Sequence, residues 1–260
     1  MSRKSCSRAL LAAALIASAV VVKGDWSALS TNGSPKAREE AGSFVHNGKM
    51  YLFGGRGTLP VQSLDLITHT WATTSTITID LHHTQPVVWN DEVWVVAGWQ
   101  GPWGNEYNLA NVVVYNPTTD SLRTGLAIPE AFARGGAGVA VYNDMVYVVQ
   151  GAVDGHQKIL GAYAFHGFSR FNPGTGTWTA LSAVPGYARD HFMAAVVGSR
   201  MIISAGRDST RSTDSALCCG YLVDPVEWID LSDPSDVWHE AAHIPVRLAG
   251  YSLVVTDTEN

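Results

Sequence analysis

The chain has 260 residues, of which 46% are hydrophobic and 15% are charged. That balance supplies enough apolar surface for a sizeable core and is unlike the charged, apolar-poor composition of disordered chains. The net charge is −6 at pH 7, from 17 basic and 23 acidic residues. An acidic chain is a poor general partner for nucleic acid or an anionic membrane surface, so the composition disfavours both.

The N-terminus has the pattern of a secretory signal peptide over residues 1–19. A basic segment within residues 3–8 precedes an apolar run over residues 9–22, and Ala17-Ser18-Ala19 supplies a small-residue cleavage site. Cleavage as late as residue 24 and an uncleaved membrane anchor are the alternatives. Because the run is shorter than the ~20 residues of a spanning helix, we expect a secreted protein without stable membrane insertion.

Four copies of one repeat organise the rest of the chain. Each copy has an apolar run that ends in a glycine, and eight residues before this glycine a tight-turn pair follows a second apolar run. The glycines are Gly55, Gly98, Gly151 and Gly206, and the turn pairs are Asn47-Gly48, Asn90-Asp91, Asn143-Asp144 and Gly198-Ser199. Such turns supply the positive φ that hairpin loops need, so each repeat is predicted to begin with a β-hairpin.

A second pair of strands follows each hairpin. An apolar residue is followed seven positions later by a large apolar residue, in the pairs Leu64 and Trp71, Tyr115 and Leu122, Phe171 and Trp178, and Leu231 and Trp238. Each unit is therefore predicted to contain four antiparallel strands. A single unit of this size cannot bury its own apolar faces and must stack on copies, and a radial stack is a β-propeller.

An arginine stands 17 residues before the repeat glycine in three copies, as Arg38, Arg134 and Arg189, and Leu81 takes this place in the second copy. Arginine, hydrophobic hairpin, glycine, Asn-Pro turn and tryptophan in this order resemble the kelch repeat. The resemblance covers residues 26–260 and implies an all-β kelch-type β-propeller with four-stranded antiparallel blades. We expect the blades at about residues 36–80, 81–132, 133–187 and 188–245.

The two ends of the chain predict a further, closing blade. The stretch "WSALS" at residues 26–30 repeats "WTALS" at residues 178–182, so the Trp26 strand is predicted to be the outer strand of that blade. A partial blade opens at Arg247, and the sequence ends before the position at which the glycine of this blade is expected. We therefore expect a fragment truncated at the C-terminus, and a small propeller with an incomplete closing blade is the alternative.

The kelch resemblance implies that residues opening each inner strand lie near the mouth of a central channel. The candidate ligand-binding residues there are Arg38, Arg134, Arg189, Arg247, His82, His83 and His191. A ring of arginines would bind a carboxylate, because the guanidinium group is planar and offers two parallel donors. The alternative is that each arginine satisfies backbone carbonyls or an acidic residue of a neighbouring blade.

The connections between second and third strands lengthen along the chain, and long loops on a rigid scaffold often carry binding groups. The candidate ligand-binding residues in them are Trp99, Trp103, Tyr107, His156, His166, Arg207 and Asp208. The aromatic residues of the second loop have the composition of a sugar-stacking surface. The alternative is that they hold the loop on its own blade.

Common enzyme signatures are absent from the sequence, including G-x-S-x-G, HExxH and Walker loops. We predict no cofactor and no metal site. The adjacent pairs His82-His83 and Cys218-Cys219 are only weak indications of a metal site, because neighbours on a strand point to opposite faces. The leading hypothesis is a secreted binding module for a carbohydrate or protein ligand, with no catalytic residue assigned and the oligomeric state open.

Two enzyme families that share the kelch propeller give the alternatives. Resemblance to N-acetylneuraminate epimerase implies a sugar-acid mutarotase or epimerase that uses Arg134, Arg189 and His191. Resemblance to galactose oxidase implies a copper oxidase, but its tyrosine, cysteine and histidine ligands have no residue-by-residue match here.

Overall fold

A computed structural model describes residues 27–74, 79–156, 167–209 and 221–255. The chain divides into two units, residues 1–30 and residues 31–260, and the second contains every strand described below. Of the first unit only residues 27–30 are described, and they are exposed and form no strand. Trp26 and the signal-peptide prediction lie outside the described residues.

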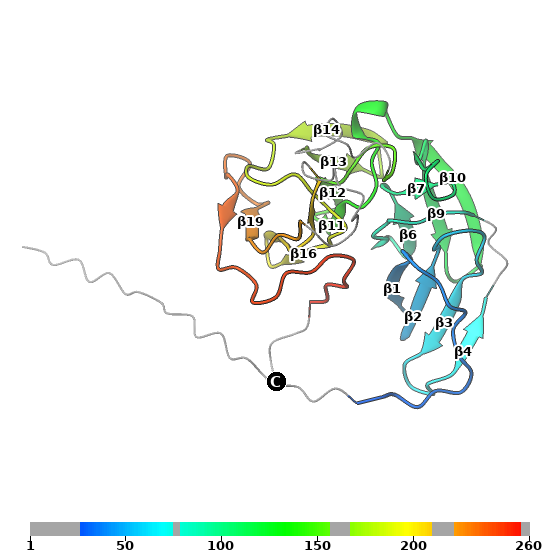
Figure 1. The fold of residues 1–260 in the computed structure, drawn as a ribbon. Helices are drawn as coiled ribbons and strands as arrows, with labels where there is room; N and C mark the ends of the chain where they lie inside the picture. The colour runs from blue at the N-terminus through cyan, green and yellow to red at the C-terminus, as the bar shows by residue number, and fades with distance from the viewer. Residues whose placement is uncertain (1–26, 75–78, 157–166, 210–220, 256–260) are drawn as a thin grey trace, which may run out of the picture. The chain divides into compact units, whose positions relative to one another are not determined.

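Four four-stranded antiparallel sheets make up residues 31–260, and Figure 1 shows them in chain order. The first contains β1 (Gly42–His46), β2 (Lys49–Phe53), β3 (Gln62–Asp65) and β4 (Trp71–Thr73). The second contains β5 (Val87–Trp89), β6 (Glu92–Val95), β9 (Asn111–Asn116) and β10 (Ser121–Ala127). The third contains β11 (Gly138–Tyr142), β12 (Met145–Val149), β13 (Phe168–Asn172) and β14 (Thr177–Leu181). The fourth contains β16 (Ala194–Val197), β17 (Arg200–Ser204), β19 (Val226–Asp230) and β20 (His239–Glu240).

Two short strand pairs and one 3₁₀ turn lie in the connections. Strand β7 (Trp99–Gln100) pairs with β8 (Tyr107–Asn108), and β15 (Arg189–Asp190) pairs with β18 (Arg207–Asp208). A single 3₁₀ turn, η1 (Glu130–Phe132), precedes the third sheet. The four blades of the sequence-based prediction are therefore present as four sheets, with no α-helix among the described residues.

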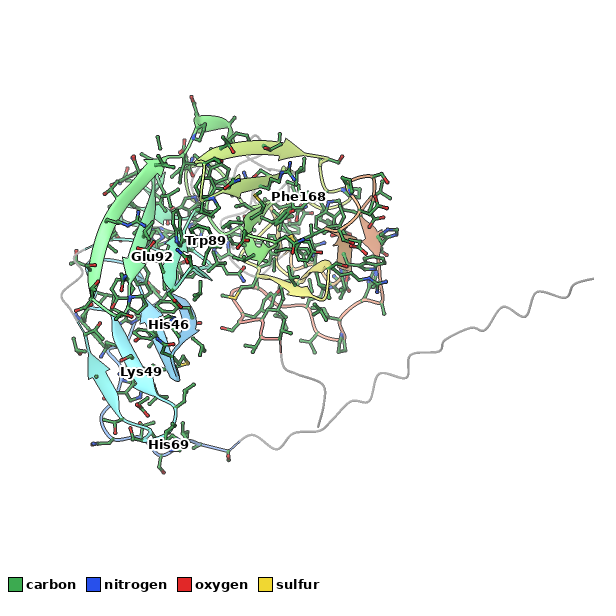
Figure 2. The ribbon with its side chains drawn as sticks, turned by 180° about the vertical axis from the view of Figure 1, so that it is seen from behind. His46, Lys49, His69, Trp89, Glu92 and Phe168 are labelled. Atoms are coloured by element: carbon green, nitrogen blue, oxygen red, sulfur yellow. The ribbon has the colours of Figure 1, made fainter. Side chains whose placement is uncertain are left out.

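The predicted hairpin turns have the backbone conformation that their residues favour. Asn47 has φ 47° and Gly48 has φ 71°, and the corresponding residues of the second and third sheets are also at positive φ. The strands meet at His46 and Lys49 in the first hairpin and at Trp89 and Glu92 in the second, as labelled in Figure 2. Two positive φ values in succession define the type I′ turn, whose twist matches that of the strands.

The outer strand pairs follow the seven-residue spacing in three of the four sheets. Leu64 pairs with Trp71, Tyr115 with Leu122, and Phe171 with Trp178. In the fourth sheet the register differs from the predicted pairing of Leu231 with Trp238. There Trp228 pairs with His239, and Glu227 pairs with Glu240.

The core lies between successive sheets. One cluster of buried apolar residues joins the first three sheets, and a second joins the third sheet to the fourth. Aromatic rings make contacts within and between sheets: the Trp178 ring centroid lies 4.9 Å from that of Phe171, and the Trp238 centroid lies 5.3 Å from that of Phe168. The repeated tryptophans are thus packing residues, which bury large apolar areas.

The repeat glycines join each sheet to the next. The amide of Gly55 donates to the carbonyl of Leu81, and that of Gly151 donates to the carbonyl of Arg189. Gly151 has φ 104°, and a Cβ atom there would lie 2.8 Å from the carbonyl oxygen of Gly135. Only glycine fits this position, because both the φ value and the close backbone approach exclude a side chain.

The C-terminal segment, residues 247–255, forms no strand. It packs on the fourth sheet through Tyr251, whose hydroxyl group donates to the carbonyl of Ser204 at 2.6 Å. The predicted opening hairpin of a fifth blade is therefore not formed within the described residues. Among all the residues that the structure describes, no helix is both long and apolar enough to cross a membrane.

Candidate functional site

One backbone position recurs two residues after the place of the repeat arginine. Its occupants are Glu40, His83, Gly136 and His191, with Gly250 continuing the series, and all five have φ between 53° and 65°. Each of the last four donates its amide N–H to the carbonyl of the one before, at 2.8–3.0 Å. This chain of backbone bonds brings side chains from different blades to one place.

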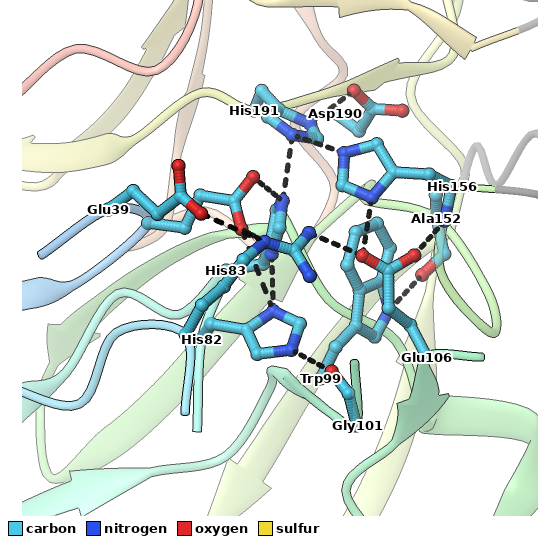
Figure 3. Close-up of polar contacts among 12 residues, drawn as sticks. Glu39, His82, His83, Trp99, Gly101, Glu106, Ala152, His156, Asp190 and His191 are labelled. Atoms are coloured by element: carbon cyan, nitrogen blue, oxygen red, sulfur yellow. Dashed lines mark hydrogen bonds and ion pairs between the residues drawn. The ribbon is translucent and has the colours of Figure 1, made fainter. Parts of the chain in front are cut away.

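Three imidazole rings and a carboxylate meet there (Figure 3). The Nε2 atom of His191 lies 2.9 Å from Nε2 of His83 and 3.2 Å from Nε2 of His156. One carboxylate oxygen of Glu40 lies 3.0 Å from Nε2 of His83. We call these four residues the histidine cluster. Each residue belongs to a different blade, and their four ligand atoms lie within 4.8 Å of one another.

Fixed acceptors hold the far side of each ring. His191 Nδ1 is 2.7 Å from a carboxylate oxygen of Asp190, and His156 Nδ1 is 2.8 Å from one of Glu106. His83 Nδ1 is 2.6 Å from Nδ1 of His82. A second ring contact of this kind orients an imidazole and fixes its tautomer.

Two arginines support these carboxylates. Arg207 donates two parallel bonds to Asp190, at 2.8 and 3.1 Å. Arg56 pairs with Glu106 and with Glu40, so it joins the carboxylate of the cluster to the one behind His156. Such bidentate and bridging contacts are typical of arginine and fix geometry as well as charge.

The electrostatic environment keeps these carboxylates ionised. Burial by itself raises the pKa of Asp190, but the nearby His191 and Arg207 outweigh it and hold that pKa far below the usual range. Burial likewise raises the pKa of Glu106, and hydrogen bonds from His156 and Arg56 bring it well below its ordinary value. Both residues are therefore anionic acceptors at any physiological pH.

Burial favours the neutral form of His83 and His156. Burial, followed by the neighbouring His191 and His156, lowers the pKa of His83 well below its ordinary value. Burial also lowers the pKa of His156, partly offset by its bond to Glu106. Neutral rings keep one lone pair each, so the cluster can accept hydrogen bonds or bind a cation.

A cavity of about 160 Å³ opens beside the cluster. Glu40, His83 and His191 supply its polar wall, while Phe192 and Tyr251 supply aromatic surface. The remaining lining comes from small or uncharged residues, and none of the described lining residues is arginine or lysine.

The predicted ring of arginines is not formed. Arg189 is fully buried and bonds to the carbonyl oxygens of Ala205 and Pro225 and to Glu227, all in the fourth blade. Arg134 is 1% exposed and donates to the carbonyl of Val148 at 2.7 Å. These contacts correspond to the structural alternative, with each guanidinium group serving its own blade.

Arg38 and Arg247 also lie away from the cluster. Arg38 donates to the carbonyl oxygens of Gly54 and Pro60 within the first blade. The carbonyl of Arg189 accepts a hydrogen bond from the amide of Gly151, and in the C-terminal segment the carbonyl of Leu248 accepts one from the amide of Gly206. Leu248 therefore has the repeat position, and Arg247 lies one residue before it. Arg247 is 64% exposed on its side chain and pairs with Asp224.

The second loop divides into a buried and an exposed part. Trp99, predicted as a ligand-stacking ring, has no exposed surface: its Nε1 donates to the carbonyl of Ala152, and its ring centroid lies 4.4 Å from that of His83. Its buried ring therefore packs against the histidine cluster. Trp103 is 57% exposed and packs beside His156, with ring centroids 4.6 Å apart, and Tyr107 is also exposed.

The other predicted loop residues are distributed as follows. His156 joins the cluster, and Arg207 positions Asp190. Asp208 is buried, and its backbone lies opposite that of Arg189 where β18 pairs with β15. His166 and the pair Cys218-Cys219 lie outside the described residues. Of the histidines predicted at the channel mouth, His83 and His191 belong to the cluster and His82 orients His83.

Sequence reasoning missed Glu40, Arg56 and Asp190 and did not assign a role to Glu106. Glu40 could have been found, because it follows Arg38 by two residues as His191 follows Arg189. Arg56 also had a signal, because it follows the repeat glycine Gly55 as Arg207 follows Gly206. Asp190 and Glu106 have no counterpart of the same residue type in the other repeats.

Comparison with known proteins agrees with this architecture. No protein-family model matches the chain. The chain is 23% identical over 227 residues to Kelch-like protein terF of Aspergillus terreus. The matched region covers 82% of this chain and 49% of that protein. The solved structure described as "Structure of YjhT" superposes with a TM-score of 0.66 at 16% identity, over 85% of this chain and 69% of that one.

The fold is a kelch-repeat β-propeller. The chain spans about half the length of the curated relative that it matches. In this propeller the histidine cluster takes one residue from each of the four described blades.

Proposed function

We propose that the propeller is a binding protein for a small hydroxylated ligand of the carbohydrate class, held in the cavity beside the histidine cluster. The observation that carries this proposal is the cavity lining, with Glu40, His83 and His191 on one side and Phe192 and Tyr251 on another. Carboxylate and neutral imidazole groups accept hydrogen bonds from hydroxyl groups, and aromatic surface suits the C–H face of a sugar.

The size and charge of the cavity narrow the ligand class. At about 160 Å³ it is smaller than the roughly 300–1,000 Å³ of sites for drug-sized molecules, so the ligand is of monosaccharide size or below. Because the described lining contains no arginine or lysine, a neutral sugar suits it better than a sugar acid. A protein ligand, the other half of the binding hypothesis, would instead contact the exposed loops.

A mutarotase is the second candidate, and one observation favours it. Two carboxylate-bound imidazoles, Asp190–His191 and Glu106–His156, face each other with their Nε2 atoms 3.2 Å apart. Anomer exchange needs a base that takes the proton of the anomeric hydroxyl group and an acid that protonates the ring oxygen. Neighbouring imidazoles with different partners are suited to these two roles.

Direct binding to the full chain tests the proposal. Neutral and acidic monosaccharides are screened by calorimetry and by ligand-observed NMR, and the anomer exchange of each is followed by NMR with and without protein. Ala41 lines the cavity, so Ala41→Leu should fill it and abolish binding. The matched control is Ala72→Leu, on the exposed outer strand β4 of the same blade, which should bind normally.

Three results would contradict the proposal. One is that no monosaccharide binds the wild-type chain, another is that Ala41→Leu binds as well as the wild type, and the third is that only protein partners are captured. Binding without faster anomer exchange would reject the mutarotase alone.

A further inference from the structure

The tautomers of the three cluster histidines can be assigned from their fixed partners. His82 Nε2 lies 3.0 Å from the carbonyl oxygen of Gly101, which can only accept, so Nε2 carries the hydrogen. In a neutral ring His82 Nδ1 is then an acceptor, and His83 Nδ1 must be the donor across their 2.6 Å contact. The lone pair of His83 is therefore on Nε2.

The same argument applies to the other two rings. His191 Nδ1 faces the carboxylate of Asp190 and His156 Nδ1 faces that of Glu106, so both Nδ1 atoms donate. Both carboxylates are buried and ionised and can only accept. In their neutral forms, His191 and His156 therefore also have the lone pair on Nε2.

The three Nε2 atoms that bear these lone pairs lie close together. The Nε2 atoms of His83 and His156 lie 2.9 and 3.2 Å from that of His191, and a Glu40 oxygen lies 3.0 Å from Nε2 of His83. Four acceptors thus face one another with no hydrogen between them. Acceptors at such distances repel unless a cation lies among them.

We propose that the histidine cluster binds one divalent first-row transition-metal ion through Nε2 of His83, His156 and His191 and one carboxylate oxygen of Glu40. The proposal goes beyond the ligand proposed above and is tested separately from it. An ion there would use the Nε2 lone pairs, so a hydroxylated ligand would bind through the ion, and the mutarotase candidate would be excluded. Three imidazoles and one carboxylate suit zinc and its neighbours in the first row.

The observed spacing fits such an ion. With metal–nitrogen distances of about 2.0–2.1 Å, neighbouring ligand atoms lie about 2.9 Å apart at right angles and about 3.4 Å apart in a tetrahedron. Three of the six distances between ligand atoms, 2.9, 3.0 and 3.2 Å, lie within this interval. The other three are at most 4.8 Å, so the ligand atoms are already gathered and would need to move only slightly toward an ion.

The surroundings of the cluster also match those of known metal sites. Metal-binding histidines usually donate their other ring hydrogen to a carboxylate, carbonyl or water, and here Asp190 and Glu106 accept two of these hydrogens. Arg56 holds the second oxygen of Glu40, which leaves the first oxygen facing His83. Three carboxylates against two guanidinium groups leave one net negative charge around the neutral rings, which favours a cation.

Metal binding by the full chain, prepared without a polyhistidine tag, tests the proposal. The protein is treated with a chelator, dialysed and titrated with Zn²⁺ in competition with a chromophoric chelator, and a parallel sample with Co²⁺ is followed by its visible absorption. We expect one Zn²⁺ per chain and a Co²⁺ spectrum with nitrogen ligation. Failure of the wild type to bind Zn²⁺ saturably would overturn the proposal.

Matched variants identify the ligands. Glu40→Gln and His191→Gln should each weaken Zn²⁺ binding by at least about 100-fold, and Asp190→Asn by about 10–100-fold through loss of ring orientation. The controls are Glu39→Gln, next to Glu40 with a side chain 75% exposed, and His243→Gln, with a side chain 51% exposed. Both controls should bind as the wild type does. Equal affinity in ligand and control variants would place the metal elsewhere and refute the assignment.

Discussion

Arg189 provides the sharpest test of the claim that the repeat arginines are structural. Its guanidinium group has no exposed surface and bonds to the carbonyl oxygens of Ala205 and Pro225, at 3.0 and 3.2 Å, and to Glu227. Arg189→Ala removes all these contacts and leaves the carboxylate of Glu227, itself 7% exposed, without a cation.

The expected loss follows from these contacts. Removing one partner of a buried ion pair costs about 3–5 kcal/mol, and each carbonyl that loses its donor adds about 1 kcal/mol. Arg189→Ala should therefore lower the free energy of unfolding by about 5–7 kcal/mol, against a total of about 5–15 kcal/mol for a typical domain. Adding Glu227→Gln should recover part of the loss, because the unpaired charge disappears.

Urea unfolding followed by tryptophan fluorescence measures this effect. The matched control is Arg123→Ala, which removes an exposed arginine paired with Glu92 and should cost no more than about 1 kcal/mol. If Arg189→Ala unfolds within about 1 kcal/mol of the wild type, Arg189 does not stabilise the blade and the structural interpretation is refuted. Loss of ligand binding with unchanged stability would restore its role at the site.

Three further predictions concern the backbone, the C-terminal segment and the N-terminus. Gly151→Ala should cost clearly more in urea unfolding than Gly48→Ala, because both have positive φ but only the first brings a Cβ against backbone; equal losses would contradict this. Burial raises the pKa of Tyr251, so its contribution to stability is complete below pH 10 and is lost as the pH rises further; Tyr251→Phe should reduce this alkaline loss, and an unchanged profile would reject the role. Expression in a secreting host should give a mature N-terminus at residue 20 or 25 by mass spectrometry, whereas an intact Met1 would reject the signal peptide.

The hairpins were predictable because their signals are local. Asn47-Gly48 and its counterparts define the turns by conformational preference alone, and the apolar runs on either side define the strands. The positions of the repeat glycines were predictable, but the reason for them was not. Their contact with the next blade joins residues that are 26 positions apart from Gly55 to Leu81 and 38 apart from Gly151 to Arg189. The repetition of the glycines indicated that the position matters, but the contact that requires glycine there is made with the next blade and is not visible within one repeat.

The site was predictable in part. The arginine position was found from its spacing, but whether a side chain enters the channel or turns into its own blade depends on the strands around it. Arg134 turns inward and donates to Val148, whereas the residue two positions later in the other blades faces the cluster. His156 comes from the connection between β12 and β13, and the corresponding connections of the other blades differ in length and sequence, so only the folded chain shows that it meets His191.

The polar character of the cluster itself indicates function, and His83 tests this argument. Buried ion-pair and imidazole networks add little net stability, because desolvation offsets their attraction, and apolar side chains of similar volume often replace them without loss. His83→Phe keeps a ring beside Trp99 but leaves the buried Nδ1 atom of His82 without its donor, so it should cost the metal-free chain no more than about 1–3 kcal/mol in urea unfolding while abolishing Zn²⁺ binding. A loss of more than about 3 kcal/mol in the metal-free protein would mean that the blades need the cluster to fold, and the histidines would then be structural rather than functional.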